Sequence, residues 1–341
     1  MMRAHLLTTR LLVMTLLLGL LAGVPLASAP AAARQDDQLQ IVFSVPGLNY
    51  PFFVHMANIA KAKAEELDIE LIVQDGQNDS STQSANLEAA IAQGVDGVVI
   101  SPKDAQALAP AIQAVIDADI PVVTIDRAVQ GATPLAHVGA DNVRGGEKQG
   151  EYLMEILPDG GKIIELQGTV GASPAIDRST GFNSVIADHP EYEIVFQQSA
   201  DFKRDLGLSV TEQALQANPD IDAIVAANDD MALGAAEAAA GAGIDVPIIG
   251  FDALPEALQA VQDGTLAATV EQFPGGQTAG AMEILVNYLR DGTEPEQQIT
   301  LIEPALITAE NVGEAERAEE AGITPTGGGA TPEAAEATPA A

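Results

Sequence analysis

The chain contains no cysteine and no tryptophan, and its 341 residues include only four tyrosines and eight phenylalanines. Without cysteine, disulfide bonds, thiolate metal sites and a lipid anchor on a thiol are excluded. Basic residues are also scarce, because 15 lysines and arginines stand against 49 aspartates and glutamates, for a formal net charge of -34. So acidic a chain repels phosphate groups, which makes nucleic acids and anionic membrane surfaces poor partners.

A long apolar run occurs only near the start of the sequence. Arg3, His5 and Arg10 accompany the run LLVMTLLLGLLAG, and small residues follow through ASAPAAA. A basic start, a short apolar middle and an A-x-A site are typical of a secretory signal, which predicts cleavage after Ala33. The alternative, a membrane anchor, needs about 20 apolar residues, and Thr, Gly and Pro interrupt this run. We expect residues 1–33 to be removed and the mature protein to be periplasmic or otherwise extracytoplasmic, without a lipid anchor.

Beyond residue 38, short runs rich in Val and Ile alternate with longer Ala-rich periodic segments. The runs predict strands at 39–45, 69–74, 97–100, 121–125, 162–166, 192–197, 222–226, 246–251 and 267–271. The periodic segments predict helices at 52–67, 81–93, 105–117, 142–157, 174–188, 204–217, 230–241, 254–262 and 275–290. Because the strands are apolar throughout, the pattern favours an α/β fold with parallel sheets that are covered by helices on both faces.

Two stretches of the sequence recur at an offset of 126 residues. PVVTIDR at 121–127 corresponds to PIIGFD at 247–252, and VDGVVISPKDAQA from Val95 aligns with IDAIVAANDDMAL from Ile221. Chance similarity between buried strands is the alternative, but one register shared by two stretches favours two similar doubly wound lobes. Ligands of such sheets bind beyond the carboxyl ends of the strands. Asp126 and Asp252, which follow the two core strands, are therefore expected to face a common crevice.

The last twenty residues, 322–341, contain little besides Thr, Pro, Gly, Ala and Glu. They have almost no bulky side chain that a core could bury. We expect this segment to be a disordered tail.

Motifs for catalysis are missing from the sequence. The histidines at 5, 55, 137 and 189 belong to no serine triad pattern and to no H-E-x-x-H motif. The first strand-to-helix turn, VPGLNYPFF, lacks G-x-G-x-x-G, and the glycines of VRGGEKQG do not fit that spacing. We expect no catalytic residue, metal or cofactor. A pair of carboxylates acting as in glycosidases is left as an alternative, since their separation decides that reaction.

Several residues suit the recognition of a polyhydroxylated ring. NYPFF at 49–53 gathers aromatic side chains, which pack on the C–H face of a sugar, and carboxylate, guanidinium and amide groups bind its hydroxyls. Each polar candidate also has a structural explanation: Asp126 and Arg127 as a surface pair, Asn228 as a helix cap, Gln272 as a turn residue. For one of Phe52 and Phe53 the alternative is that its ring packs the helix against the sheet and does not contact a ligand. The shared position of the polar candidates at strand ends favours binding.

With these motifs the sequence resembles the periplasmic sugar-binding proteins of the ribose-binding type, the receptors of sugar ABC transporters. The resemblance covers about residues 39–310. It is carried, in order, by NYPFF, IDRAV, HVGADNVRGG, IIELQGTVGAS, SADFKRDLGL, ANDDMALGA, IIGFD and GTLAATVEQFP. It implies the type I periplasmic binding protein fold, with an N-terminal lobe of 39–140 plus 273–301 and a C-terminal lobe of 141–272 plus 302–312. The three crossings are expected near Ala140–Asp141, Gln272–Phe273 and Leu301–Ile302.

The resemblance also implies a set of ligand contacts. Phe52 and Phe202 are expected to sandwich the sugar ring, with Phe53 beside them. The residues implied to hydrogen-bond the hydroxyls and the ring oxygen are Asp126, Arg127, Arg178, Asn228, Asp252 and Gln272. Tyr50 and Ser101 stand where a ribose binder has asparagine, and because both changes remove amide contacts they make ribose itself a doubtful ligand.

From the resemblance we expect a monomer that captures a pentose or hexose between its lobes. Its closed form would dock transiently on a membrane ABC permease. A receptor for a chemoreceptor or sensor kinase is an alternative with the same binding chemistry. Sugar-responsive repressors are disfavoured, because the predicted signal peptide occupies the place of their DNA-binding helices.

Overall fold

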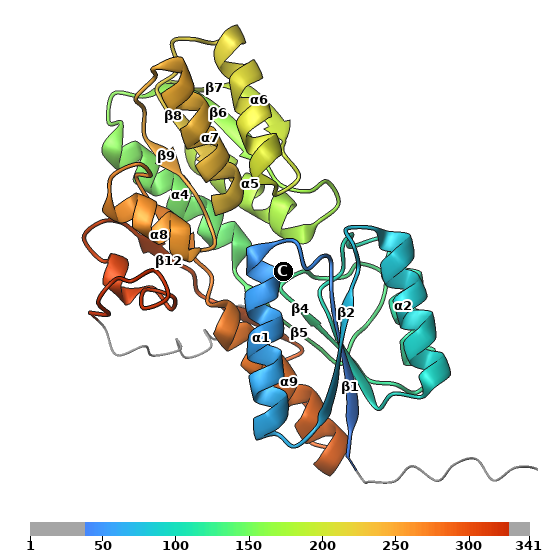
Figure 1. Ribbon diagram of the computed structural model, residues 1–341. Coiled ribbons are helices and arrows are strands. Elements are labelled where there is room, and N and C mark those ends of the chain that lie inside the picture. Colours follow the sequence, from blue (N-terminus) through green and yellow to red (C-terminus); the bar gives the residue numbers. More distant parts are fainter. Residues whose placement is uncertain (1–37, 327–341) are drawn as a thin grey trace, which may run out of the picture. The chain divides into compact units, whose positions relative to one another are not determined.

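The computed structural model describes residues 38–326, so the predicted signal peptide lies outside the described residues (Figure 1). Elements follow in the order β1 (Gln40–Val45), α1 (Pro51–Glu66), β2 (Glu70–Asp75), α2 (Ser80–Gln93), β3 (Gly97–Ile100), α3 (Ala109–Asp117), β4 (Val122–Ile125), β5 (Ala136–Ala140), α4 (Asn142–Ile156), β6 (Gly161–Gln167), α5 (Ser173–Ile186), β7 (Tyr192–Ser199), α6 (Arg204–Ala217), β8 (Ala223–Ala226), α7 (Asp229–Ala242), β9 (Ile248–Ile249), α8 (Pro255–Gln262), β10 (Thr269–Glu271), α9 (Pro274–Asp291), β11 (Ile299–Ile302), β12 (Ala305–Ile307) and the 3₁₀ helix η1 (Val312–Glu314).

The first sheet has the strand order β11-β5-β4-β3-β1-β2, with every neighbouring pair parallel. Successive side chains of a strand point to opposite faces. Accordingly, Ile41 and Phe43 join a core with α1 and α9, while Val42 packs with Leu87 of α2 and Ile112 of α3. Figure 1 shows α1 and α9 next to each other along this sheet, with α2 on its other side. Burial on both faces explains the uninterrupted apolar runs of these strands.

The second sheet has the order β7-β6-β8-β9 and is also parallel. Ile163 packs with Leu153 of α4 and Phe182 of α5, whereas the next residue, Ile164, packs in the core that includes Val210 of α6 and residues of α7. Helix pairs therefore cover both faces, α4 with α5 on one and α6 with α7 on the other.

The predicted internal repeat is confirmed by the two sheets. The order β2-β1-β3-β4 of the first recurs as β7-β6-β8-β9 in the second. Strands β3 and β8 lie 126 residues apart along their whole length, and β4 and β9 start at 122 and 248. The α/β prediction with two doubly wound sheets is therefore correct.

Several elements differ from those predicted. Strands β5, β11 and β12 were not predicted, because each is short; β5 also contains Gly139, and β12 directly follows Pro304. Helix α3 begins four residues later than expected, since residue 105 instead donates its backbone N–H to the carbonyl oxygen of Gly171 at 3.0 Å. Strand β9 is reduced to two residues, Ile248–Ile249.

The chain passes between the sheets at three places. Strand β5 ends in the first sheet and α4 packs on the second, β10 precedes α9 on the first sheet, and β11 leads from the first sheet to β12. Strands β10 and β12 pair with each other in antiparallel fashion. The predicted lobe boundaries near 140, 272 and 301, and their action as a hinge, stay predictions.

The segment after β12 packs against the rest of the molecule. Val312, Ala318 and Ile323 are buried with Leu258 of α8. The backbone N–H of Glu316 donates to the buried carboxyl group of Glu271 at 3.2 Å. The predicted disordered tail begins at residue 322, but Ile323 is buried in this core. Residues 327–341 of the predicted tail lie outside the described part.

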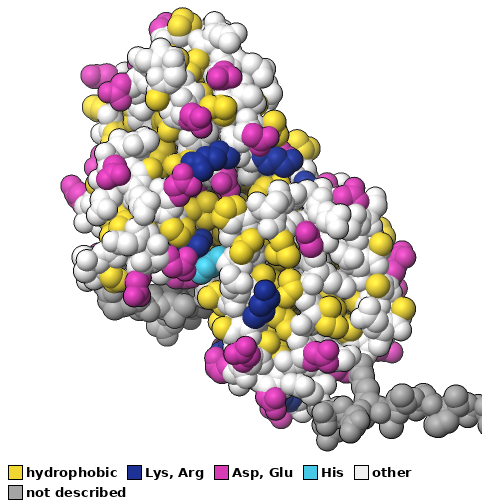
Figure 2. Space-filling model, viewed as in Figure 1, with side chains coloured by type: hydrophobic (Ala, Val, Ile, Leu, Met, Phe, Trp, Pro, Cys, Tyr) yellow, Lys and Arg dark blue, Asp and Glu magenta, His cyan; other side chains and the backbone are white. Residues whose placement is uncertain are grey.

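On the surface, acidic side chains are spread over the face shown in Figure 2 and form no single patch. This distribution fits solvated helix faces rather than one acidic binding surface. Among the helices of residues 38–326, none is both long enough and apolar enough to cross a bilayer.

Candidate ligand-binding site

A pocket lies where the carboxyl ends of strands from both sheets approach each other. All predicted site residues except Ser101 line it, and Pro174 and Asp230 join them. The lining comes from the turn before α1 and the start of α1, the residues after β4, helix α5, the turns that follow β7, β8, β9 and β10, and the start of α7. The complete lining is Tyr50, Phe52, Phe53, Asp126, Arg127, Pro174, Arg178, Phe202, Asn228, Asp230, Asp252 and Gln272.

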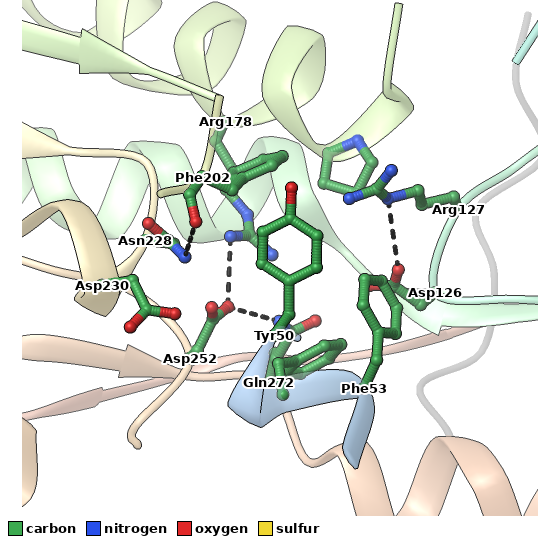
Figure 3. Close-up of a pocket in the computed structure, with 12 residues that line it drawn as sticks. Tyr50, Phe53, Asp126, Arg127, Arg178, Phe202, Asn228, Asp230, Asp252 and Gln272 are labelled. Atoms are coloured by element: carbon green, nitrogen blue, oxygen red, sulfur yellow. Dashed lines mark hydrogen bonds and ion pairs between the residues drawn. The ribbon is translucent and has the colours of Figure 1, made fainter. Parts of the chain in front are cut away.

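Four aromatic rings form the apolar part of this lining. The centroids of Phe52 and Phe53 are 5.2 Å apart, and those of Tyr50 and Phe53 are 6.0 Å apart, both edge to face. Phe202 contributes the fourth ring from the second sheet (Figure 3). Phe52 and Phe53 both line the pocket and are both buried in the core.

The position of Phe202 depends on a close approach to the backbone. Its ring covers Gly168, where a Cβ atom would lie 2.1 Å from Cζ of Phe202. Any larger residue at 168 would push the ring away, so this glycine allows the ring to lie on the loop after β6.

One end of the pocket is built around Asp126 and Arg127. Ser101 donates its hydroxyl to Oδ2 of Asp126 at 3.0 Å, and Nε of Arg127 lies 3.7 Å from the same oxygen. The Arg127 guanidinium stands 5.3 Å from the Phe53 ring and 5.6 Å from the Phe202 ring. Ser101 thus supports the site from behind instead of lining it. Within residues 38–326, Nε of Arg127 is buried without a hydrogen-bond partner, which leaves a donor beside the pocket.

The other end is built around Arg178 and Asp252. Nη1 of Arg178 donates to the carbonyl oxygen of Ala227 at 2.6 Å and to Oδ1 of Asp252 at 3.2 Å. Nε of Arg178 donates to Asn142 at 2.8 Å, and Gln272 donates to Oδ1 of Asp252 at 2.6 Å. These partners hold both charged groups in fixed orientations (Figure 3), as in preorganised binding sites.

Burial dominates the electrostatics of these groups. It raises the pKa of Asp252 to about 7, against the opposing effect of Arg178, and it raises the pKa of Asp126 against Arg127. It also lowers the pKa values of both arginines. Charged groups that have lost their water interact strongly with ligand hydroxyls.

Left-handed backbone conformations gather at the pocket. The φ angles of Asp126, Phe202 and Asp252 are 60°, 58° and 108°. Non-glycine residues rarely adopt this region, which costs of order 1 kcal/mol each and clusters at functional sites. The surrounding cores must therefore hold these three side chains at their positions.

Helices α4 and α5 fix the position of Arg178. Gly146, from the VRGGEKQG stretch, lets α5 approach so closely that a Cβ atom at 146 would lie 2.1 Å from the carbonyl oxygen of Arg178. The glycines that fit no nucleotide motif thus have a packing role next to the site.

Contacts between loops of the two sheets lie beside the pocket. Tyr50 donates its hydroxyl to the carbonyl oxygen of Asp201 at 3.4 Å, and Ala128 donates its backbone N–H to the hydroxyl of Ser173 at 2.9 Å. Nζ of Lys103 lies 3.8 Å from Oδ1 of Asp201. Together these contacts hold the loops of both sheets around the pocket.

Three residues at the site were missed by the sequence reasoning. Pro174 and Asp230 line the pocket, and Asn142 contacts Arg178. Asp230 follows Asn228 within NDD, and Asn142 lies in HVGADN. Both residues could have been found in the sequence only because they lie in motifs that carry the resemblance. Within 38–326, no group of three or more His, Asp or Glu side chains is arranged to hold a metal ion.

Comparison with known proteins agrees with this geometry. A periplasmic binding protein domain model matches residues 41–294. The chain is 41% identical to the ribose import binding protein of Bacillus subtilis (strain 168) over 250 residues, 73% of this chain and 81% of the relative. It is 35% identical to the galactofuranose-binding protein of Escherichia coli (strain K12), covering 79% and 87%.

Among solved structures, the Caulobacter myo-inositol binding protein matches with a TM-score of 0.81 and 37% identity, over 84% of this chain and 98% of that one. The resemblance suggested by the sequence motifs is thereby confirmed. On the fold, the pocket and these matches together, the chain belongs to the periplasmic binding protein family.

Proposed function

We propose that this protein is an exported receptor that captures a monosaccharide, a pentose or a hexose, in the pocket between its two sheets. The observation that carries the proposal is the combination of aromatic rings with arginine–carboxylate pairs at both ends of one pocket. Aromatic faces pack on the C–H groups of a sugar, while fixed carboxylate and guanidinium groups bind its hydroxyls.

The identity of the sugar is narrowed by two residues. Tyr50 uses its hydroxyl on the backbone of Asp201, and Ser101 uses its hydroxyl on Asp126. Neither supplies the amide that the resemblance associates with ribose. The relatives include proteins named for ribose, galactofuranose, D-apiose and xylitol, so the names of related chains cover several sugars and one sugar alcohol. These points support a sugar other than ribose.

Capture depends on both sheets. A ligand that touches residues from both stabilises the closed arrangement of the two lobes through its higher affinity for that state. An ABC permease that recognises the closed arrangement would then receive the sugar. The import proteins among the relatives support this partner, and the apolar run of residues 11–23 supports export.

A sensory role without transport is the second candidate. One solved structure, at 26% identity and a TM-score of 0.77, is the fructose-binding periplasmic domain of a hybrid two-component system. Catalysis is not proposed, because Asp126 and Asp252 are engaged with hydroxyl, arginine and amide partners that suit binding.

A thermal-shift screen of residues 34–341 against pentoses, hexoses, deoxysugars, inositols and polyols tests the proposal. A ligand at about 100 times its dissociation constant stabilises the folded state by about 2.7 kcal/mol, which shifts the melting curve clearly. Asp126→Ala should abolish that shift, because it leaves ligand hydroxyls without their acceptor. A well-folded protein that no member of the panel stabilises would overturn the proposal.

A further inference from the structure

Asp230 is the pocket residue for which neither the fold nor the sugar contacts proposed above supply a role. It is the second residue of α7 and lines the pocket on the same side as Asn228 and Asp252 (Figure 3). Asp126 and Arg127 lie on the opposite side of the pocket. Both sides therefore present a carboxyl group.

The side chain of Asp230 lacks a partner. Asn228 caps α7 through the N–H of Met231 at 3.0 Å, and the carboxyl group of Asp229 is bound by Leu254 and Thr269. Within residues 38–326, the Asp230 carboxyl group has no side-chain hydrogen bond or ion pair, although the residue is more than half buried. A half-buried carboxylate without a donor costs free energy unless a ligand supplies one.

The nearby cation does not fill this gap. Arg204 at the start of α6 acts on Asp230 through its charge, but its guanidinium is held by both carboxylate oxygens of Glu256, at 2.9 and 2.5 Å. Burial raises the pKa of Asp230 to about 6, so at neutral pH and above the group is mainly a carboxylate, which only accepts hydrogen bonds. The missing partner is therefore a hydrogen-bond donor.

Asp230 lies where the central pocket adjoins a hollow on the protein surface. Tyr50, Phe202 and Asp230 line both the central pocket and a neighbouring surface hollow that extends to Lys203 and Glu237. A ligand group beside Asp230 is thus at the edge of the central pocket. A bulky or anionic substituent there would meet the carboxylate, and a hydroxyl would satisfy it.

Taking these observations together, and on the basis of the proposed sugar-binding function, we propose that Asp230 is a specificity-determining residue that accepts a hydrogen bond from the ligand hydroxyl opposite Asp126. The ligand class is a neutral sugar or cyclic polyol with hydroxyl groups on two opposite edges. Sugars that carry hydrogen or a phosphate at the Asp230 edge are selected against, because hydrogen leaves the carboxylate unpaired and phosphate repels it.

Titration calorimetry at pH 7.5 with D-ribose, 2-deoxy-D-ribose, D-galactose, 2-deoxy-D-galactose, 6-deoxy-D-galactose and myo-inositol tests this assignment. For a sugar that binds the wild type, we expect one deoxy form to bind about tenfold weaker or worse, as for loss of a hydrogen bond to a charged group. In Asp230→Asn and Asp230→Ala the parent sugar should weaken by a similar factor, and the preference for parent over that deoxy form should largely vanish.

Glu237→Gln is the matched control, because it removes one negative charge from the same helix at a residue that lines the outer hollow but not the central pocket. It should bind every sugar as the wild type does. Unliganded melting curves identify any variant that fails to fold, and two substitutions at 230 guard against that. If the wild type binds a sugar and Asp230→Asn keeps both its affinity and its deoxy preference, the assignment of Asp230 is wrong. If the wild type binds none of the probes, the proposed function and this inference fail together.

Discussion

At the scale of single residues, Arg178 both lines the pocket and holds a buried hydrogen-bond network together. The side chain is 3% exposed and donates to a backbone carbonyl oxygen, to Asn142 and to Asp252. Removing one partner from such a buried network is costly, because the remaining polar groups lose their hydrogen bonds and stay buried.

Arg178→Ala should lower the free energy of unfolding by about 3 kcal/mol or more, measured by urea denaturation, and should abolish sugar binding. Arg144→Ala is the control, because Arg144 bonds Glu147 and Glu151 but is 31% exposed. Its loss should cost less than about 1 kcal/mol. Equal losses for the two variants would show that burial does not govern the contribution of Arg178.

Glu271 predicts a dependence of stability on pH. Its carboxyl group is fully buried, and burial together with the nearby Glu316 raises its pKa from 4.5 to about 8. The folded state therefore holds the proton more tightly than the unfolded state does. The stabilisation from this group is complete below about pH 4.5 and is lost as the pH rises toward about 8.

In Glu271→Gln the free energy of unfolding should fall less steeply across this range, by up to about 1.4 kcal/mol per pH unit. Urea denaturation at a series of pH values measures the slope. Glu283→Gln makes the same exchange at an exposed residue of α9 and should leave the wild-type slope in place. An unchanged slope in Glu271→Gln would mean that the buried carboxyl group is not protonated in the folded state.

At the scale of secondary structure, the close approach of α4 and α5 predicts that a substitution between these helices lowers both stability and sugar affinity. Gly146→Ala places a methyl group against the backbone of Arg178 and should cost about 1–3 kcal/mol of stability, because the helices must separate. Sugar affinity should fall with it, since α5 carries Arg178.

Gly241→Ala offers the matched comparison on α7. A Cβ atom there has no neighbour within 4 Å, so the substitution should raise stability by about 0.5–1 kcal/mol through helix propensity alone and leave affinity unchanged. Thermal melting and calorimetry of both variants give the two readouts. A Gly146→Ala variant that behaves like Gly241→Ala would contradict the packing role of Gly146.

Elements with a strong local pattern were predictable, and those held by distant contacts were not. Helix α6 begins and ends at its predicted residues, 204 and 217, because its apolar residues recur with a helical period. Strands β3 and β8 keep their predicted offset, because each is a continuous apolar run. Strand β11 is only four residues long and pairs at the sheet edge with β5, which is distant in sequence, so no local signal specifies it. Likewise, Asp126 and Asp252 could be placed from strand ends, but Asp230 could not, since an acid in the first turn of a helix usually needs no ligand.

At the scale of the whole molecule, the loops of the two sheets meet beside the pocket, and the chain lacks cysteine. An introduced pair would therefore be the only thiols present. The double variant Ala128→Cys with Ser173→Cys joins the segment after β4 to the first residue of α5, where the backbone N of Ala128 and Oγ of Ser173 lie 2.9 Å apart.

When oxidised, this variant should exchange its bound sugar more slowly than when reduced, because the disulfide keeps the two sheets together. Stopped-flow exchange against excess ligand measures the rates, and each single cysteine variant is a control for the substitutions themselves. Identical rates in the oxidised and reduced forms would show that sugar leaves without separation of these loops.

The left-handed residues around the pocket also decide how this receptor could be redesigned. Asp126, Phe202 and Asp252 adopt φ angles that most other residues tolerate poorly. A library that randomises these positions would therefore consist largely of destabilised variants. Tyr50 and Asp230 line the same pocket from extended and helical backbone, which accepts many side chains. New sugar selectivity is therefore best sought by varying Tyr50 and Asp230 while the three left-handed positions are kept.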